Sequence, residues 1–404
     1  MPGLPVGEPA QPRPPTATSL RGLAAAGLVA AALLLGLAGW WFFRIAVRTK
    51  PVADWMTFHL AARLYFEGRL AELFDGAGFT AAMNAAFAGL LAHPIPFQPW
   101  VYPPSFLLLL LPFGLLPFWP AYGAFLAVSL GALLLAVRAF AHRPAHRWLL
   151  AAALMLSPAM AAGVLLGQNS LLTCALLLGS LAALPASPLV AGALLGLLSF
   201  KPQLGLLIPV ALLAGRQYRA IASATVVAVG LAAASLAVFG PAAWVQWLEF
   251  AAGRGALYQQ WVVENRLHGE SVFAAVVALG GPARLAGAAQ LGAILAAAGC
   301  VWWAYSRPMG RLVQAAVLLC AIVLSSPHLL SYDMLPAGLA AAMMLLVFQA
   351  RGGGPGGRVA CLVVWAAPIV TVLVHSWLAI TLIAGGCIGL LWFGRGDAAR
   401  PASR

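Results

Sequence analysis

The sequence contains very little charge for its length. Only 8% of its 404 residues are Asp, Glu, Lys or Arg, while 63% are hydrophobic. An ordinary soluble domain has about 25% charged residues, so 23 basic and 10 acidic side chains cannot cover the surface of a soluble fold of this size. This scarcity excludes a soluble enzyme and a disordered chain, and it predicts an all-α integral membrane protein with many spans.

Clustered basic residues are also missing. The formal net charge is +13, but the arginines occur mostly singly between apolar segments. A nucleic-acid-binding surface needs a basic patch, whereas scattered arginines are typical of membrane topology. We therefore expect the lipid bilayer, and no nucleic acid, as a partner.

Cofactor motifs are absent as well. The five cysteines lie in apolar segments, and no pair has the spacing of metal ligands or indicates a disulfide framework. The sequence has no nucleotide phosphate-binding loop, no dinucleotide-binding glycine motif and no His/Cys metal set. We expect no cofactor. The loops on the cytoplasmic side are too short to bind a nucleotide, so we expect an activated substrate that is delivered from within the bilayer.

Twelve apolar segments are expected to cross the membrane as a helix bundle, because a hydrocarbon core of about 30 Å needs about 20 residues per helix. They lie at 22–43, 104–138, 148–166, 170–184, 188–200, 203–214, 219–239, 283–305, 312–326, 333–350, 359–374 and 376–393. The 104–138 segment is broken by prolines and is expected to hold an interfacial piece before its span. The segments 188–200 and 203–214 are short for a membrane span. An alternative is that they form one helix kinked at Pro202.

The charge distribution orients this bundle. Twelve spans put both termini on one side, where 14 of the 23 basic residues but two of the ten acidic ones fall, and positive loops mark the cytoplasm. We expect a disordered cytoplasmic tail at 1–21, one transmembrane domain at 22–394 and a cytoplasmic tail at 395–404. Two external loops, 44–103 and about 240–282, carry surface helices, and the first helix, from Asp54 to Gly68, is expected to lie along the membrane surface.

In this topology, polar residues other than arginine gather on the external side. Ionisable groups near the hydrocarbon are costly, so each is a candidate functional group. These residues come from loops far apart in sequence, yet the topology brings them to one face. The pattern predicts a single external cavity rather than a path through the membrane.

Asp54 is the strongest candidate, because it follows the first span and begins the surface helix. As a general base it would take the proton from a sugar hydroxyl that attacks an anomeric carbon, and partial burial would raise its pKa toward neutrality. The alternative is a helix N-cap, whose hydrogen bonds stabilise the anion instead.

Lys201 is the second candidate, since it is one of only two lysines among 23 basic residues. It interrupts two apolar segments and would bind a phosphate leaving group, with Gln203 as an added donor. The alternative is a lysine that extends its amine to the membrane surface.

Several further residues are candidates for ligand contacts, and each also has a plain structural interpretation as a turn, a helix cap or a solvated surface. The proposed phosphate contacts are Arg266 and His328, and the proposed substrate contacts are Tyr102, Gln168, Asn169 and Asp333.

The order of these landmarks resembles that of glycosyltransferase family 87, the polyprenol-phosphate-mannose-dependent mannosyltransferase-like proteins of the GT-C superfamily. The resemblance covers about residues 50–240. It rests on Asp54-Trp55 with Arg63-Leu64 and Gly68, then Leu73-Phe74-Asp75, Tyr102-Pro103-Pro104, Gly167-Gln168-Asn169-Ser170 and Lys201-Pro202-Gln203.

The resemblance implies a GT-C-type fold in the plasma (inner) membrane with a periplasmic active site. It implies transfer of a hexose, with mannose the family's expected sugar, from a polyprenyl phosphate to a lipid or glycan acceptor. Asp54 would be the base and Lys201 the family's motif lysine, and we expect an inverting reaction. Two other classes stay open, a transporter or lipid flippase without covalent chemistry and a structural subunit with an inactive site.

Overall fold

The protein is described here from a computed structural model, which covers residues 52–95, 97–265, 270–352, 354–369 and 376–394. The first expected span (22–43), both terminal tails and Arg266 lie outside the described residues. The described part of the chain contains helices and no strand, as the composition predicts.

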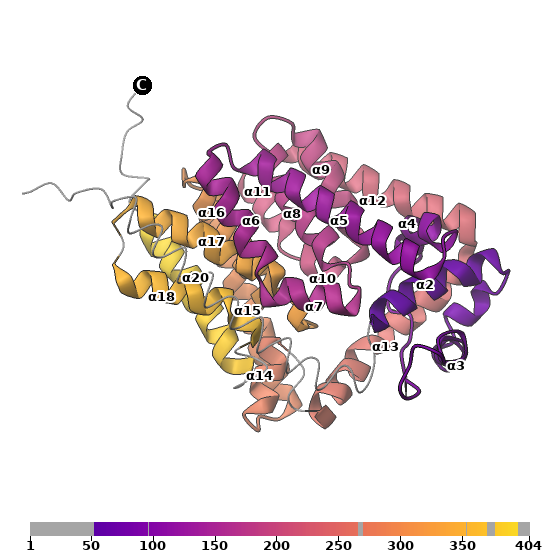
Figure 1. The fold of residues 1–404 in the computed structure, drawn as a ribbon. Coiled ribbons are helices and arrows are strands. Elements are labelled where there is room, and N and C mark those ends of the chain that lie inside the picture. Colours follow the sequence, from indigo (N-terminus) through magenta and orange to yellow (C-terminus); the bar gives the residue numbers. More distant parts are fainter. Residues whose placement is uncertain (1–51, 96, 266–269, 353, 370–375, 395–404) are drawn as a thin grey trace, which may run out of the picture.

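The elements follow one another in chain order (Figure 1). They are α2 (Ala53–Phe66), η1 (Leu70–Leu73), α3 (Gly76–Ala86), α4 (Pro104–Gly114), α5 (Phe118–Phe140), α6 (Pro144–Met155), α7 (Pro158–Leu166), α8 (Ser170–Ala183), α9 (Pro188–Leu197), η2 (Leu198–Phe200), α10 (Pro202–Gly205), α11 (Ile208–Ala214), α12 (Tyr218–Phe239), α13 (Pro241–Asn265), α14 (Val272–Ala278), α15 (Ala283–Tyr305), α16 (Arg311–Ser325), η3 (Ser331–Met334), α17 (Leu335–Ala350), α18 (Pro355–Trp365) and α20 (Ser376–Gly394).

Four helical segments of the described chain are long and apolar enough to cross a membrane, namely α5, α12, α15 and η3 with α17. A fifth span is formed if α6 and α7, which are bent by 53° at their junction, cross together. Six further apolar helices have only 10–17 residues, which is about 15–25 Å of helix against a core of about 30 Å. Within the described residues, length and composition therefore support four or five spans, while the hydropathy of the whole sequence predicted twelve, the first of which (22–43) lies outside these residues.

Prolines account for much of this difference. Pro117 separates α4 from α5, as expected for the 104–138 segment, and Pro158 begins α7 after the bend. The chain between 188 and 214 is broken at Lys201, where the 3₁₀ turn η2 ends and Pro202 begins α10. A proline cannot donate the backbone hydrogen bond that would continue the preceding helix, so long apolar segments become pairs of short helices.

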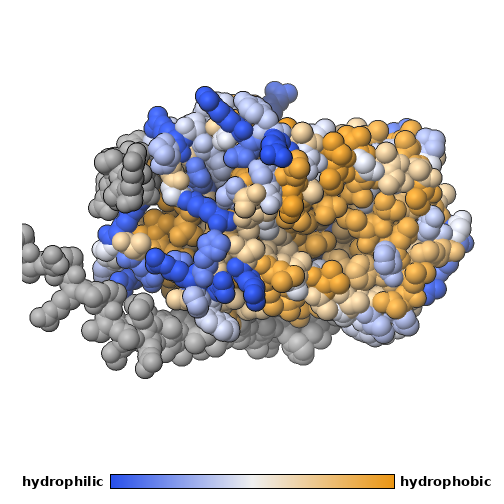
Figure 2. All heavy atoms as spheres, turned by 90° about the horizontal axis from the view of Figure 1, so that it is seen from above, coloured by the Kyte–Doolittle hydropathy of each residue, from blue (hydrophilic) through white to orange (hydrophobic). Residues whose placement is uncertain are grey.

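Helices α16 and α17 pack against each other and are buried along most of their length, and the hydrophobic core extends from them through α8 and α4 to α2. By contrast, α5, α9, α12 and α15 carry exposed large hydrophobic side chains, including Val128, Leu189, Val226 and Leu295. Figure 2 shows a broad hydrophobic surface over one part of the molecule and hydrophilic side chains gathered at the other end. Such an apolar exterior fits a membrane protein.

Helix α2, the segment expected to lie along the membrane surface, is largely enclosed by protein. Ten of its residues are buried, among them Trp55, Phe58 and His59. It packs against α4, η1 and α3 at the end of the molecule opposite to α18 and α20 (Figure 1). Its apolar residues cover several faces because protein, rather than lipid, surrounds most of it.

Candidate active site

The loop between α7 and α8 fixes the start of α2. The backbone N–H of Val52 donates to the carbonyl of Leu165 at 3.1 Å. Gly167 has φ +73°, and a Cβ built on it would lie 2.4 Å from Cβ of Trp55. Glycine is required here both for the left-handed backbone and for the close approach. The contact brings Gln168 beside Asp54.

Asp54 lies in the first turn of α2, not at its N-cap, because Val52 occupies that position without a side-chain cap. Its carboxylate is partly buried, and Oδ1 accepts a hydrogen bond from Nε2 of Gln98 at 3.3 Å. Burial raises the pKa of Asp54 from 3.8 to about 6, although the Gln168 side chain and the charge of Lys201 lower it. A carboxyl with this pKa is mostly ionised at neutral pH and still accepts a proton readily.

Lys201 and Asp333 form a buried ion pair. The amine Nζ of Lys201 donates to Oδ1 of Asp333 at 2.6 Å, and both side chains are almost fully enclosed. The same nitrogen lies 5.6 Å from the ring centroid of Tyr332. The two partners come from chain breaks, since Lys201 separates η2 from α10 and Asp333 lies in the short turn η3 before α17. Broken helices thus bring a cation and an anion into an apolar bundle.

Gln168 connects the carboxylate to Tyr102. Its Oε1 accepts hydrogen bonds from the hydroxyl of Tyr102 at 3.2 Å and from the backbone N–H of Asn169 at 3.0 Å. Because Oε1 of Gln168 already accepts two hydrogen bonds, the amide nitrogen of Gln168 is the atom that donates to Asp54. Asn169 is fully buried, and neither polar atom of its side-chain amide has a hydrogen-bond partner.

The structure therefore brings together five of the nine residues that the sequence suggested. The members of this cluster, called the polar cluster below, are Asp54, Tyr102, Gln168, Lys201 and Asp333. Asn169 is adjacent to the cluster, but among the described residues its side-chain amide has no hydrogen-bond partner there. Gln203 is partly exposed in α10, and His328 is partly exposed in the loop before η3, where its carbonyl accepts from Ser326.

Sequence reasoning gave no role to two further side chains near the polar cluster. Gln98 bonds to Asp54 as described, and Glu270 is buried with its backbone N–H donating to the carbonyl of Leu329 at 3.1 Å. Oε2 of Glu270 has no hydrogen-bond partner among the described residues. Burial, followed by the charge of Asp333, raises the pKa of Glu270 well above its usual value. The sequence signal for Glu270 was its position as an acidic residue just before the apolar helix α14.

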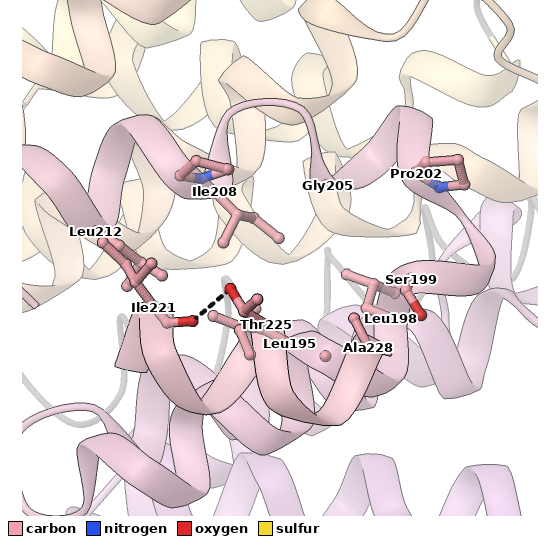
Figure 3. A pocket seen from close by; sticks show the side chains of 13 residues that line it. Leu195, Leu198, Ser199, Pro202, Gly205, Ile208, Leu212, Ile221, Thr225 and Ala228 are labelled. Atoms are coloured by element: carbon pink, nitrogen blue, oxygen red, sulfur yellow. Dashed lines mark hydrogen bonds between the residues drawn. The ribbon is translucent and has the colours of Figure 1, made fainter. Parts of the chain in front are cut away.

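An apolar cavity of about 240 Å³ opens where the chain on either side of Lys201 folds against α12 (Figure 3). It is lined by residues of α9, η2, α10, α11 and α12. Ser199 and Pro202 belong to its lining, so one end of the cavity lies near Lys201 in the chain. The few polar groups in its lining bond mostly within the protein. For example, the hydroxyl of Thr225 donates to the carbonyl of Ile221 at 3.0 Å.

Metal ligands do not gather in the described part of the chain. No group of three His, Cys, Asp or Glu side chains there is arranged to hold an ion.

Comparison with known proteins gives the family. Residues 100–327 match the family model for glycosyltransferase family 87. The chain belongs to glycosyltransferase family 87. The matched range contains Tyr102, Gln168 and Lys201, while Asp54 precedes it and Asp333 follows it. No curated protein and no solved structure matches the chain. Family membership together with the apolar helices identifies a membrane glycosyltransferase.

Proposed function

We propose that this glycosyltransferase moves a hexose from a polyprenyl-phosphate donor to a lipid or glycan acceptor, with inversion at the anomeric carbon. Mannose is the sugar to test first, because of the family resemblance described above. The observation that carries the proposal is the position of Asp54, a partly exposed carboxylate with a raised pKa whose neighbours include a buried lysine.

Asp54 would act as the general base. The acceptor hydroxyl oxygen forms a bond to the anomeric carbon while its proton passes to the Asp54 carboxylate. The bond between that carbon and the donor phosphate oxygen breaks, and the lipid phosphate leaves with the electron pair. A single displacement of this kind inverts the anomeric configuration. Hydrogen bonds from Gln98 and Gln168 would hold the carboxylate in place.

Lys201 would stabilise the departing phosphate. Its ammonium group has three N–H donors, and one of them is used by Asp333. Asp333 then fixes the position of the amine, while two donors remain for phosphate oxygens. Electrostatic stabilisation of a leaving group is strongest when the cation is held in place before the reaction and shielded from water, and Lys201 is buried. Arg266 and His328 are proposed as further phosphate contacts.

The polyprenyl chain would enter through the apolar cavity beside α10 (Figure 3). A lipid tail gains about 0.8 kcal/mol for each CH₂ group that it buries, so an apolar cavity near a phosphate-binding cation suits a lipid phosphate. Tyr102, Gln168, Asn169 and Gln203 are proposed to contact sugar hydroxyls. The chemistry uses no metal or nucleotide in this proposal.

We further propose that the chain forms a GT-C-type bundle of about twelve spans in the inner membrane, with both termini cytoplasmic and the polar cluster periplasmic. The short helices α8, α9 and α16 would each cross with the help of adjoining turns. The excess of basic residues on one side of the predicted topology supports this orientation.

A transfer assay tests the proposal. Membranes that contain wild type or Asp54→Asn protein are given radiolabelled polyprenyl-phosphate mannose or glucose and an acceptor lipid extract. We expect labelled product from wild type and a decrease of at least about 100-fold for Asp54→Asn, which is the usual size of a general-base contribution. Glu67→Gln serves as the matched control, since Glu67 is an exposed acid one residue beyond α2. Equal transfer by wild type and Asp54→Asn would refute the base assignment.

A further inference from the structure

A second, basic cavity lies away from the polar cluster. It has a volume of about 210 Å³ and is formed where α5 turns into α6, beside the start of α16 and the end of α17. Its charged and titratable lining residues are His142, Arg143, His146 and Arg311, and its walls include Phe140 and Leu346. We call it the basic cavity.

The directions of the helices put the basic cavity at the opposite end of the bundle from the polar cluster. Helix α8 begins directly after Gln168 and Asn169, and its last turn contacts Arg311. Helix α17 begins directly after Asp333, and Leu346 near its end lines the cavity. Helices of 14–16 residues separate the two sites by about 20 Å. The basic cavity is therefore a separate site.

Arg311 is held in a fixed position at this cavity. Its Nη2 donates to the carbonyls of Leu181 and Ala182 at 2.9 and 3.0 Å, and its guanidinium carbon lies 4.5 Å from the ring centroid of Phe140. The carbonyls belong to the last turn of α8, which has no further helical partners for them. Nε of Arg311 is buried and has no hydrogen-bond partner in the described part of the chain. A fixed guanidinium with an unused buried donor is prepared for an anion.

Among the residues that the structure describes, no acidic side chain lines the cavity. The ion pairs recorded in the described part of the chain use Arg63, Arg69 and Lys201, none of which belongs to it. Two arginines and two histidines thus face one space without a counter-ion from the lining. An external anion is the partner that would neutralise them.

The surroundings of the basic cavity are those of a membrane surface. Trp148 of α6, two residues beyond His146, is 76% exposed, and Leu135 of α5 is 68% exposed one turn before the cavity. Tryptophan prefers the level of the lipid head groups, and exposed leucines prefer the acyl chains. The topology predicted from the sequence puts the arginines at 138, 143, 147 and 311 on the cytoplasmic side. An anion bound here would sit at the head-group level of that leaflet.

We propose that the basic cavity binds the phosphate of a membrane phospholipid head group, at the end of the bundle opposite to the glycosyl transfer site. Arg311 and Arg143 bind the phosphate oxygens, His142 and His146 close the cavity, and the acyl chains lie along α5. Paired guanidinium groups suit phosphate because each offers parallel N–H donors. Basic cavities between transmembrane helices on the cytoplasmic side are a known location for anionic lipid head groups.

Binding of short-chain lipids to the purified full chain in neutral detergent tests this proposal. Dioctanoyl phosphatidic acid is titrated while the midpoint of thermal unfolding is followed, because a ligand that binds only the folded state raises that midpoint. We expect saturable stabilisation for wild type. Arg143→Gln should weaken the apparent affinity about tenfold, as expected for the loss of one charge-assisted hydrogen bond.

Arg138→Gln is the matched control. Arg138 is exposed near the end of α5 but does not line the cavity, so this variant should bind like wild type. Arg311→Gln is expected to abolish binding, and Arg143→Gln keeps the test valid if loss of the α8 contacts prevents folding of that variant.

Three outcomes would overturn the proposal. One is the absence of saturable stabilisation by the lipid. Another is equal weakening by Arg138→Gln and Arg143→Gln, which would show diffuse surface attraction. The third is equal affinity for inorganic phosphate and the lipid, which would identify a soluble anion as the ligand.

Discussion

The amine of Lys201 lies 2.6 Å from the carboxylate of Asp333, although 132 residues separate them in the chain. The pair connects the break between η2 and α10 to the turn that begins α17, so it holds the two halves of the described chain at one point. Asp54 responds to both charges, since Lys201 lowers its pKa and Asp333 raises it. The ionisation of Asp54 therefore depends on the charges of Lys201 and Asp333.

Removal of one member of this pair should be costly. Asp333→Asn leaves a buried ammonium without its counter-ion, and breaking a buried pair in this way costs roughly 3–5 kcal/mol. We expect a large decrease in the unfolding midpoint in detergent. Glu72→Gln is the control, because the pair between Arg69 and Glu72 at 2.7 Å is exposed and screened by water, so its loss should change the unfolding midpoint little. Equal effects of the two substitutions would contradict the buried character of the Lys201–Asp333 pair.

The pH dependence of transfer follows from Asp54. The base must be ionised to accept a proton, and its pKa is raised to about 6. We therefore expect kcat/KM to rise with pH up to about 6 and to level off above it, where the free enzyme is deprotonated. Glu67→Gln should keep the same profile. A profile that is flat between pH 5 and 7 would exclude Asp54 as the titrating base.

The same shift makes a prediction for stability. The folded state holds a proton on Asp54 up to about pH 6, while the ordinary value is 3.8, so the unfolding free energy falls as pH rises between these values. At pH 7 the ionised carboxylate costs up to ~3 kcal/mol, less whatever water at its exposed edge screens. Asp54→Asn should therefore unfold at a higher temperature than wild type at pH 7 but not at pH 4. A lower unfolding temperature at pH 7 would contradict the prediction.

The sequence predicted the residues of the polar cluster better than their contacts. Asp54, Lys201, Tyr102, Gln168 and Asp333 each stand out as polar groups between apolar segments, because burying such groups is costly. The partner of Lys201 was not predictable, since it depends on how α10 packs against the start of α17. Gln98 and Glu270 were missed because a single amide or acid in a polar loop is usually solvated.

Hydropathy was less informative about the helices. It located α8, α12, α15 and α16 within a few residues, but it counts apolar length and does not register a bend. The 148–166 segment contains a 53° bend between α6 and α7. For α2, apolar residues on several faces signalled burial inside protein, which the sequence alone does not distinguish from contact with lipid.

Gly167 provides a test of how the cluster is assembled. Gly167→Ala would place a Cβ 2.4 Å from that of Trp55 and force an alanine into φ +73°. The left-handed backbone alone costs about 1–2 kcal/mol, and the clash must in addition displace the start of α2. We expect lower stability and loss of transfer. Gly68→Ala is the control, because Gly68 has φ +71° but no atom within 4 Å of the added Cβ; it should lower stability slightly and keep transfer.

Glu270 supplies the last prediction, because its burial and the nearby charge of Asp333 raise its pKa well above 4.5. The folded state then binds a proton more tightly than the unfolded chain, so this stabilisation is complete below about pH 4.5 and is lost as pH rises through the folded-state pKa. Glu270→Gln mimics the protonated form and should lower this dependence, so its stability relative to wild type should increase with pH. Glu249→Gln, at an exposed acid of α13, should show no such trend. A Glu270→Gln protein that is destabilised equally at pH 5 and pH 9 would mean that Glu270 is ionised in the folded state and has a partner that glutamine cannot replace.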